Sequence, residues 1–279
     1  LEDMLTNEKP DMVDICVPSY LHKEVAIKCM DAKIHTLCEK PIANEMKDAL
    51  EMMDAYKRNS VYFMIAQIIR FMPEYVYLKK IYDQGDYGKL RNASFSRLCQ
   101  APIWGSGWYT DPSKSGLAPF ELHIHDVDFI HYMLGLPKEV QSVGFEDYEK
   151  RNSYISTRYV YDDGLIVNAE GGWFIGALPF SMEYMAIFDK AVITFKDNLV
   201  MVYPEGGEAF KAELDNVVNI TSDINLKNAG GMYNEIRYFI ECIRSGKAIE
   251  VVTPEQSIQT LDMLLKEVES RNTGKIVRI

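Results

Sequence analysis

The chain has 279 residues, 47% of them hydrophobic and 25% charged, which is the composition of an ordinary soluble globular protein. Its formal net charge of −11 argues against nucleic acid or an anionic membrane surface as a partner. No apolar run approaches the roughly 18 residues of a membrane helix and no signal peptide is recognisable, so we predict a cytoplasmic protein. The five cysteines form no C-x-x-C pair, which predicts reduced thiols and no metal site.

The first part of the chain predicts a parallel α/β unit. Residues 1–8 resemble the end of a helix, and helical spacing of apolar residues recurs over residues 22–32. A further helix is expected to begin with Asn44 as its N-cap. Short connections between strand, helix and strand predict parallel pairing with a right-handed crossover. The three predicted strands span residues 13–17, 34–38 and 61–69.

The carboxyl ends of these three strands predict a ligand crevice. In open α/β sheets the ligand lies outside the carboxyl ends of the strands. Residues 18–22, 39–41 and 67–70 should therefore line one crevice.

After Pro73 the pattern changes to a helix followed by alternating segments. The helix is predicted over residues 73–84, and the tripeptide Asp162-Asp163-Gly164 is a hairpin signal. Two more helices are expected, over residues 234–244 and after an N-cap at Thr253. This order predicts a mostly antiparallel open sheet with helices on one face. The predicted strands span residues 92–98, 154–161, 165–171, 182–188 and 191–195, and the predicted domains are residues 1–72 and 73–279.

Two motifs point to chemistry. The tetrapeptide Cys38-Glu39-Lys40-Pro41 places a lysine at the end of a buried strand, and Glu121 to Asp128 contains three acids and two histidines. In a helix, Glu121 and His125 share a face, so the carboxylate can orient the imidazole or contact the same ligand. Acids at a helix N-terminus are also stabilised by the helix dipole, which accounts for Asp126 and Asp128 but not for the histidines.

Together these residues resemble the glucose-fructose oxidoreductase and inositol 2-dehydrogenase family (Gfo/Idh/MocA). The resemblance rests on Pro18 with His22, Cys38 to Pro41, Arg70-Phe71 before Pro73, and Glu121 to Asp128 followed by Leu134-Gly135. It implies a Rossmann domain that binds NAD or NADP, then an α/β domain whose open sheet forms the sugar site. It also implies a homodimer or homotetramer through that second domain.

The resemblance assigns roles to individual residues. Lys40 matches the family's active-site lysine at the reacting oxygen, and His125 matches the histidine that exchanges the proton. Glu121 stands where many members have aspartate, as an orienting group or a substrate ligand. His123 stands where many members carry a small residue, and we hypothesise that it reaches the substrate. The expected cofactor-binding residues are Pro18, Ser19, His22, Glu39, Lys40 and Pro41, and Trp108 and Tyr109 are expected to wall the sugar site.

Elementary chemistry supports these assignments, although each has an alternative. An imidazole with a pKa near 6.5 suits the removal of a hydroxyl proton at neutral pH, and an ammonium stabilises the negative charge that develops on the oxygen. Lys40 could instead be a surface lysine, His125 a structural histidine and Glu121 an acid at a helix start. Arg70 could bridge the domains, and Trp108 and Tyr109 could form a lid packed on their own domain.

One element of the family pattern is missing from the sequence. No G-x-G-x-x-G segment follows a strand, and the acidic residue about 20 positions further on that would bind the ribose is missing as well. We therefore expect a truncated chain, with a natural short form as the alternative. The choice between NAD and NADP would lie in that segment.

Three functions are compatible with the sequence. The first is a nicotinamide-dependent oxidoreductase acting on a sugar, inositol or related polyol. The second is a non-catalytic subunit of the same fold that binds a sugar or pairs with a catalytic partner. The third is a glycoside-cleaving relative that uses a tightly held NAD for transient oxidation.

Overall fold

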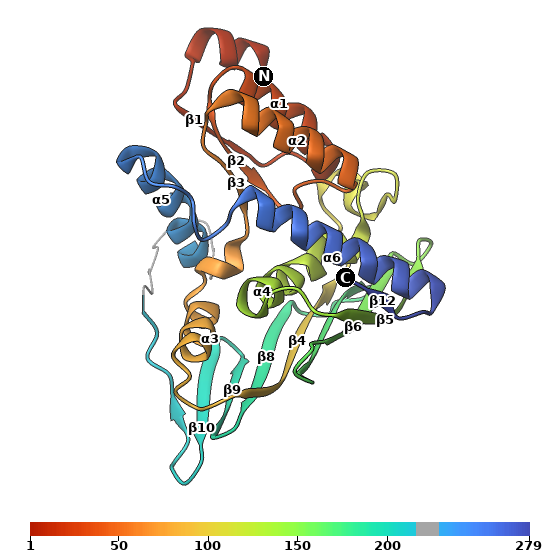
Figure 1. Cartoon of the computed structure of the whole chain (residues 1–279). Helices are drawn as coiled ribbons and strands as arrows, with labels where there is room; N and C mark the ends of the chain where they lie inside the picture. Colours follow the sequence, from red (N-terminus) through yellow and green to blue (C-terminus); the bar gives the residue numbers. More distant parts are fainter. Residues whose placement is uncertain (216–228) are drawn as a thin grey trace.

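The computed structural model describes residues 1–215 and 229–279, and its first part is a three-stranded parallel sheet (Figure 1). The strands are β1 (Met12–Ile15), β2 (His35–Glu39) and β3 (Phe63–Ala66), in the order β1-β2-β3. Helices α1 (His22–Asp31) and α2 (Met46–Asn59) connect them. The predicted parallel unit is confirmed, although β3 ends earlier than residue 69 because residues Ile68–Phe71 form a short 3₁₀ helix, η3.

Both faces of this sheet are covered, which explains why β3 is apolar throughout and buried at every position. Helices α1 and α2 pack on one face, with Ala26 and Met52 against Ile15. Helix α5 (Ala229–Ser245) packs on the other face, where Phe239 joins Met64 in a second apolar cluster. The carboxyl ends of the strands are left facing the second part of the chain.

A nine-stranded sheet forms that second part, in the order β11-β10-β9-β8-β4-β7-β6-β5-β12. Only β4 and β7 pair in parallel, so the predicted mostly antiparallel sheet is confirmed. The sequence patterns missed β5, β10, β11 and β12. The bounds are β4 (Leu90–Gln100), β5 (Glu139–Asp147), β6 (Asn152–Val160), β7 (Ile166–Phe174), β8 (Ser181–Phe188), β9 (Ala191–Lys196), β10 (Leu199–Pro204), β11 (Phe210–Lys211) and β12 (Val277–Arg278).

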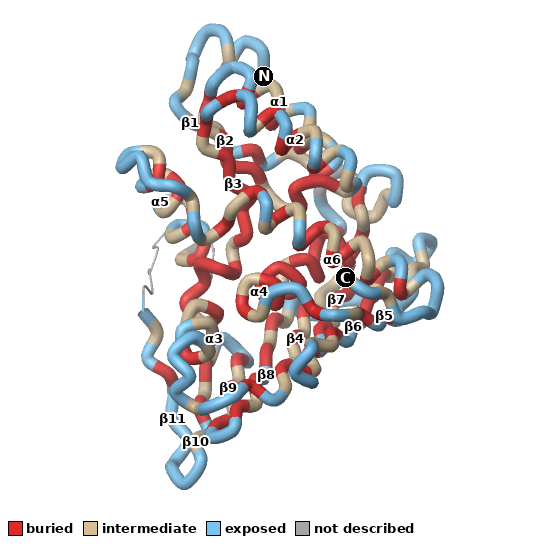
Figure 2. The backbone as a smooth tube through the Cα atoms, viewed as in Figure 1, coloured by how far each residue is buried: buried red, intermediate tan, exposed pale blue. Residues whose placement is uncertain are grey.

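Helices α3 (Pro73–Gln84), α4 (Ile124–Leu134) and α6 (Pro254–Thr273) lie on one face of the large sheet (Figure 1). The Tyr75 ring of α3 meets Phe129 of α4 at 4.8 Å and Tyr184 of β8 at 5.4 Å between centroids, so aromatic contacts join two of the helices to each other and to the sheet. In Figure 2 the buried residues gather where α4 and α6 meet the strands. Among residues 1–215 and 229–279, no helix covers the opposite face of the sheet (Figure 1).

Helix α6 connects the two parts of the molecule. It contacts β3 and α2 of the parallel unit as well as α4 and β5. As predicted, it begins at the N-cap Thr253, whose hydroxyl accepts from the Gln256 backbone N–H in a complete capping box. No helix within residues 1–215 and 229–279 combines the length and apolar character needed to cross a bilayer.

The predicted capping role of Asn44 is wrong. The N-cap of α2 is Glu45, without a side-chain hydrogen bond. The amide of Asn44 instead donates to the Lys114 carbonyl oxygen at 3.0 Å, so this residue ties the loop after β2 to a loop of the second part. The proposed domain boundary near Met72 falls between η3 and α3 and stays a prediction.

Candidate active site

The loops after β1 and β2 are joined by His22, at the start of α1. Its Nδ1 lies 2.8 Å from the Pro41 carbonyl oxygen and its Nε2 lies 3.0 Å from that of Val17. Burial lowers the pKa of His22, which favours a neutral ring that donates to one carbonyl only. The side chain is buried, so it shapes the crevice from behind instead of facing into it.

Lys40 meets Glu121 across the gap between the two sheets. The Lys40 Nζ donates to the Glu121 carbonyl oxygen at 2.8 Å and lies 3.5 Å from its Oε2. The other carboxylate oxygen accepts from the Ser19 hydroxyl at 2.6 Å. The side chain of Glu121 is 3% exposed and that of Lys40 is 13% exposed, so the lysine is the member of the pair that reaches the crevice.

His125 lies one helical turn beyond Glu121, on α4, and is half-buried. Burial lowers the pKa of His125 well below its usual value, and the positive charges of Lys40 and Arg97 lower it further. The ring is therefore neutral at neutral pH. Its Nδ1 is buried and has no hydrogen-bond partner among the described residues.

The structure corrects the expectation that Glu121 orients the imidazole. No hydrogen bond between Glu121 and His125 is present in the described part of the chain. The two carboxylate oxygens are occupied by Ser19 and Lys40, and residues Pro119–His123 form a π-helical turn, η5, before α4 begins. The carboxylate therefore holds the lysine rather than the histidine.

His123 points the opposite way from its neighbours. It is fully buried, and its Nε2 lies 2.9 Å from Glu267 Oε2 on α6. A side chain in this position lies in the interior, so the hypothesis that His123 reaches the substrate does not fit its surroundings. We leave it out of the substrate site.

Trp108 and Tyr109 lie on a 3₁₀ helix, η4 (Gly105–Thr110), beside the crevice. Their rings stack with centroids 3.9 Å apart, and Trp108 meets Tyr20 edge-on at 6.5 Å. Burial raises the pKa of Tyr109, and the charge of Glu121 raises it further. The aromatic pair thus bridges the two parts of the molecule at the crevice.

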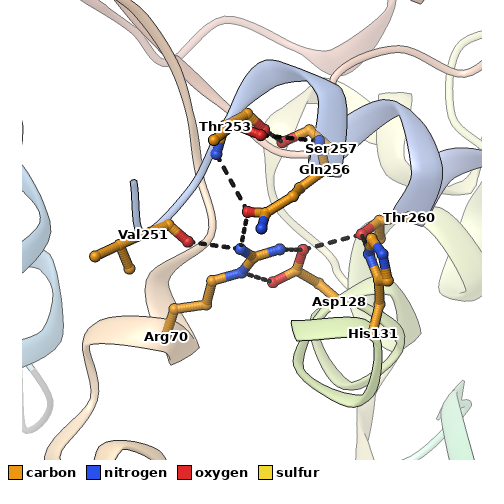
Figure 3. A network of polar contacts seen from close by, with 8 residues as sticks. All are labelled: Arg70, Asp128, His131, Val251, Thr253, Gln256, Ser257 and Thr260. Carbon is orange, nitrogen blue, oxygen red and sulfur yellow. Dashed lines mark hydrogen bonds and ion pairs between the residues drawn. The ribbon is translucent and has the colours of Figure 1, made fainter. Parts of the chain in front are cut away.

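The remaining acids of the segment are paired with buried arginines. Asp126 accepts two hydrogen bonds from Arg97, at 2.9 and 3.0 Å. Asp128 accepts two from Arg70, both at 2.7 Å, and Figure 3 shows Arg70 also reaching Gln256 near the start of α6. Arg70 thus bridges the two parts of the chain. Asp126 and Asp128 form buried ion pairs in the interior of the protein.

Sequence reasoning missed the buried Glu235, whereas Gln67, also buried, belongs to residues 67–70 that were expected to line the crevice. Burial raises the pKa of Glu235 well above its usual value, and the charge of Glu39 raises it further. Oε1 of Glu235 and Oε1 of Gln67 lack partners among the described residues. The position of Glu235 four residues before the buried Phe239 was a usable signal, because it places the acid on the apolar stripe of α5.

These groups fit the polar end of a nicotinamide dinucleotide. A carboxylate at Glu39 can accept from ribose hydroxyls, and the unpartnered Gln67 oxygen can accept from a carboxamide. Burial raises the pKa of Glu39, which disfavours the charged carboxylate. Hydrogen-bond donors of a bound ligand would stabilise the charged form and offset this effect. The rest of this candidate cofactor site consists of Ser19, Lys40 and the two loops that His22 joins.

A cavity of about 620 Å³ lies elsewhere, between α3 and α5, with Pro73, Lys79 and Tyr238 among its lining residues. Neither Lys40 nor His125 lines it. The chemistry-bearing groups therefore lie outside this cavity, at the ends of the parallel strands.

Two family models match the chain in sequence. One, described as "Oxidoreductase family, NAD-binding Rossmann fold", matches residues 1–67, and the other, the GFO/IDH/MocA C-terminal domain, matches residues 75–185. Both halves of the molecule thus match the same family.

Curated relatives match about half of the chain. It is 31% identical over 150 residues to the 2,7-anhydro-N-acetylneuraminate hydratase of Escherichia coli (strain K12), covering 52% of this chain and 39% of the relative. It is likewise 31% identical over 150 residues to the D-glucoside 3-dehydrogenase of the same organism, covering 53% and 42%. The matches thus span about two fifths of the length of these relatives.

The fold extends over the whole chain in solved structures. A levoglucosan dehydrogenase in complex with NADH and levoglucosan superposes with a TM-score of 0.86 at 18% identity, covering 100% of this chain and 82% of the other. With both family models matched in order and the fold shared from end to end, the chain belongs to the Gfo/Idh/MocA oxidoreductase family.

Proposed function

We propose that this protein is an NAD(P)-dependent oxidoreductase that acts on a hydroxyl or carbonyl group of a sugar, inositol or related polyol. The observation that carries the proposal is the meeting of Lys40 with Glu121, one turn from His125, at the carboxyl ends of the parallel strands. When bound, the nicotinamide dinucleotide would accept or supply the hydride. The chain's own residues handle the proton and the charge.

His125 is the proposed proton acceptor in the oxidation of an alcohol. Because its pKa lies well below the usual value, the ring is unprotonated at neutral pH and free to take a proton. In the reverse direction the same imidazole returns a proton to the oxygen. His125 is only partly buried, which leaves part of the residue accessible to a substrate hydroxyl.

Lys40 is the proposed stabiliser of the reacting oxygen. Its ammonium has three N–H donors, and Glu121 uses one through its carbonyl oxygen. A remaining donor can point at an oxygen that gains negative charge as hydride leaves the carbon. Glu121, anchored by Ser19, fixes the direction of the lysine side chain.

Pro18, Ser19, His22, Glu39 and Pro41 are proposed to form the cofactor crevice. Glu39 would accept from ribose hydroxyls, while buried His22 would act indirectly by holding two loops together. Titration of the protein with NAD and with NADP would show which of the two cofactors it prefers.

Trp108 and Tyr109 are proposed to wall the sugar site. Aromatic faces stack on the C–H surfaces of a pyranose, and this pair lies next to Glu121. A D-glucoside 3-dehydrogenase and a levoglucosan dehydrogenase are among the proteins that this chain resembles, which supports a sugar substrate.

A second candidate function is supported by the hydratase relatives. The chain is as similar to a 2,7-anhydro-N-acetylneuraminate hydratase as to a glucoside dehydrogenase, at 31% identity each. Lys40 and His125 would then serve a transient oxidation followed by addition of water. Such an enzyme converts its substrate without net change in free NAD, whereas a dehydrogenase reduces one NAD for each substrate oxidised.

A homodimer or homotetramer through the uncovered face of the large sheet is also proposed. That face carries polar side chains such as Ser96 and Tyr154, which both donate to Glu170. Light scattering is expected to give at least twice the mass of the 32.0 kDa chain. A monodisperse 32 kDa species would contradict this assembly.

The test of the proposed function is a hydride-transfer assay with Lys40→Met as the variant. Absorbance of NADH or NADPH is followed against a panel of aldoses, 1,6-anhydrosugars and inositols, with product analysis to detect conversion without net reduction. Loss of one charge-stabilising donor should lower kcat about 10²- to 10³-fold. Lys23→Met, which removes a partly buried lysine on the surface of α1 that is paired with Asp48, is the control and should keep wild-type turnover. Wild-type turnover by the Lys40 variant would remove that residue from the mechanism.

A further inference from the structure

The buried pair of His123 and Glu267 lies directly behind the candidate catalytic residues. The Nε2 of His123 lies 2.9 Å from Glu267 Oε2, and the same oxygen accepts from the Thr157 hydroxyl at 2.8 Å. The Tyr159 hydroxyl is 3.4 Å from the same ring nitrogen. His123 Nδ1 and Glu267 Oε1 have no partner among the described residues, so the ring is held through Nε2.

The backbone beneath His123 is fitted to this arrangement. Gly171 on β7 faces His123, and a Cβ at Gly171 would lie 2.5 Å from the His123 Cβ and 2.9 Å from its Cα. Any larger residue would push the segment off the sheet, because real Cβ atoms do not approach so closely. The absence of a side chain at Gly171 thus lets η5 lie against β7 while the imidazole reaches α6.

Helical geometry connects this anchor to the site. Residues two apart in an α-helix differ by about 200° in direction, and in the wider π-helical turn η5 they also point to roughly opposite sides. Glu121 precedes His123 by two residues and His125 follows it by two. When the His123 ring is fixed on the inner side of the helix, the helix cannot rotate about its axis. The directions of Glu121 and His125 on the crevice side are therefore fixed as well.

We propose that His123 and Glu267 form a positioning pair, which holds the start of α4 so that Glu121 and His125 keep their places relative to Lys40. The inference rests on the proposed function and adds two residues to it. His123 does not touch the substrate, and its effect passes through the backbone of residues 121–125. Displacements of about 1 Å in such groups can cost about 10²-fold in rate.

The experiment compares His123→Ala and Glu267→Gln with wild type. Ser270→Ala is the matched control, because Ser270 is also a buried residue of α6 that makes a hydrogen bond to the large sheet, at the Ser142 backbone N–H. Cooperative thermal unfolding confirms that each variant is folded. The readouts are kcat and KM, and the titration midpoint of His125 by NMR of ¹³C-labelled histidine, assigned with His125→Asn.

In His123→Ala we expect kcat to fall about 10- to 100-fold with a smaller change in KM. We expect the His125 midpoint to rise toward 6.5, because the displaced ring becomes less buried and moves away from the charges of Lys40 and Arg97. Glu267→Gln should shift both readouts in the same direction by less, and Ser270→Ala should shift neither. An unchanged His125 midpoint in folded His123→Ala overturns the proposal. If His123→Ala does not fold, an unchanged midpoint in folded Glu267→Gln overturns it. The midpoint is informative even if no sugar is turned over, which separates failure of this inference from failure of the proposed function.

Discussion

Two sets of charged side chains leave the same short segment, residues 121–128, in opposite directions. Asp126 and Asp128 turn inward, where Arg97 and Arg70 each donate two hydrogen bonds to them. Glu121 turns instead toward Ser19 and Lys40, and His125 follows it by one helical turn and lies close enough for the Lys40 charge to lower its pKa. Residues adjacent in sequence therefore belong to different environments.

The difference lies in how completely the groups are paired. The Arg70 and Asp128 side chains are fully buried, and Thr260 adds a third hydrogen bond to the carboxylate. His125, by contrast, has a lowered pKa, and its Nδ1 has no hydrogen-bond partner in the part of the chain that the structure describes. Complete pairing holds a structure together, whereas incompletely paired titratable groups beside a crevice are free to act on a ligand.

Removing Arg70 is expected to give the largest loss of stability. Arg70→Met leaves the Asp128 carboxylate buried without its partner, which typically costs about 3–5 kcal/mol of unfolding free energy. Chemical denaturation monitored by circular dichroism measures this. Arg237→Met, which breaks the exposed pair with Glu241, is the control and should cost less than about 1 kcal/mol. Equal losses of unfolding free energy in the two variants would show that the buried pair stabilises the fold no more than the exposed pair does.

The fold was largely predictable because its signals are local. Apolar runs and helical spacing are carried by neighbouring residues, so β1, β2 and α3 were found from sequence. The missed strand β5 has a buried alternation at its start only, and exposed positions follow from Val143 to Phe145. Alternation over so few residues does not distinguish a strand from a loop.

Sequence motifs named the candidate site residues but not the contacts that these residues make. Lys40 and His125 lie in recognisable motifs, yet Ser19 and Glu121, 102 residues apart, meet only in the folded chain. His123 was assigned to the substrate because nothing nearby in sequence reveals Glu267, 144 residues away. The direction of a side chain on a helix depends on which neighbour is packed against it, and that information is tertiary.

Glu235 offers a pH-dependent test of the incompletely paired region. Its pKa is raised in the folded state, so the native protein binds more protons than the unfolded chain above the ordinary glutamate pKa, and stability falls as pH rises through that interval. Glu235→Gln removes this loss, by about 1.4 kcal/mol for each unit by which the pKa is raised. The unfolding free energy of the variant relative to wild type should therefore increase between pH 5 and pH 8.

Glu241→Gln is the control for this measurement, because Glu241 lies on the exposed face of the same helix. It should show no comparable increase with pH. A difference between Glu235→Gln and wild type that stays constant with pH would contradict the buried, proton-binding role of Glu235.

The smallest expected effect is at the aromatic wall. Trp108→Ala removes the ring stacked on Tyr109 and should raise KM for the sugar about two- to tenfold with kcat nearly unchanged, since an aromatic contact contributes about 0.5–1.5 kcal/mol. Steady-state kinetics measures this. Tyr203→Ala, an exposed aromatic on β10 near the other edge of the large sheet, is the control. If kcat falls and KM stays unchanged, Trp108 does not bind the sugar, and its segment instead closes over the site during turnover.

The most direct test of the two-sided segment uses two neighbouring residues, His125 and Asp126. In His125→Asn we expect kcat to fall about 10²- to 10⁴-fold, while the free energy of unfolding changes by less than about 1 kcal/mol. In Asp126→Asn we expect the unfolding free energy to fall by about 3–5 kcal/mol, with turnover within about tenfold of wild type below the melting temperature. A stable but inactive Asp126 variant, or an active but unstable His125 variant, would contradict the division of this segment into a catalytic side and a structural side.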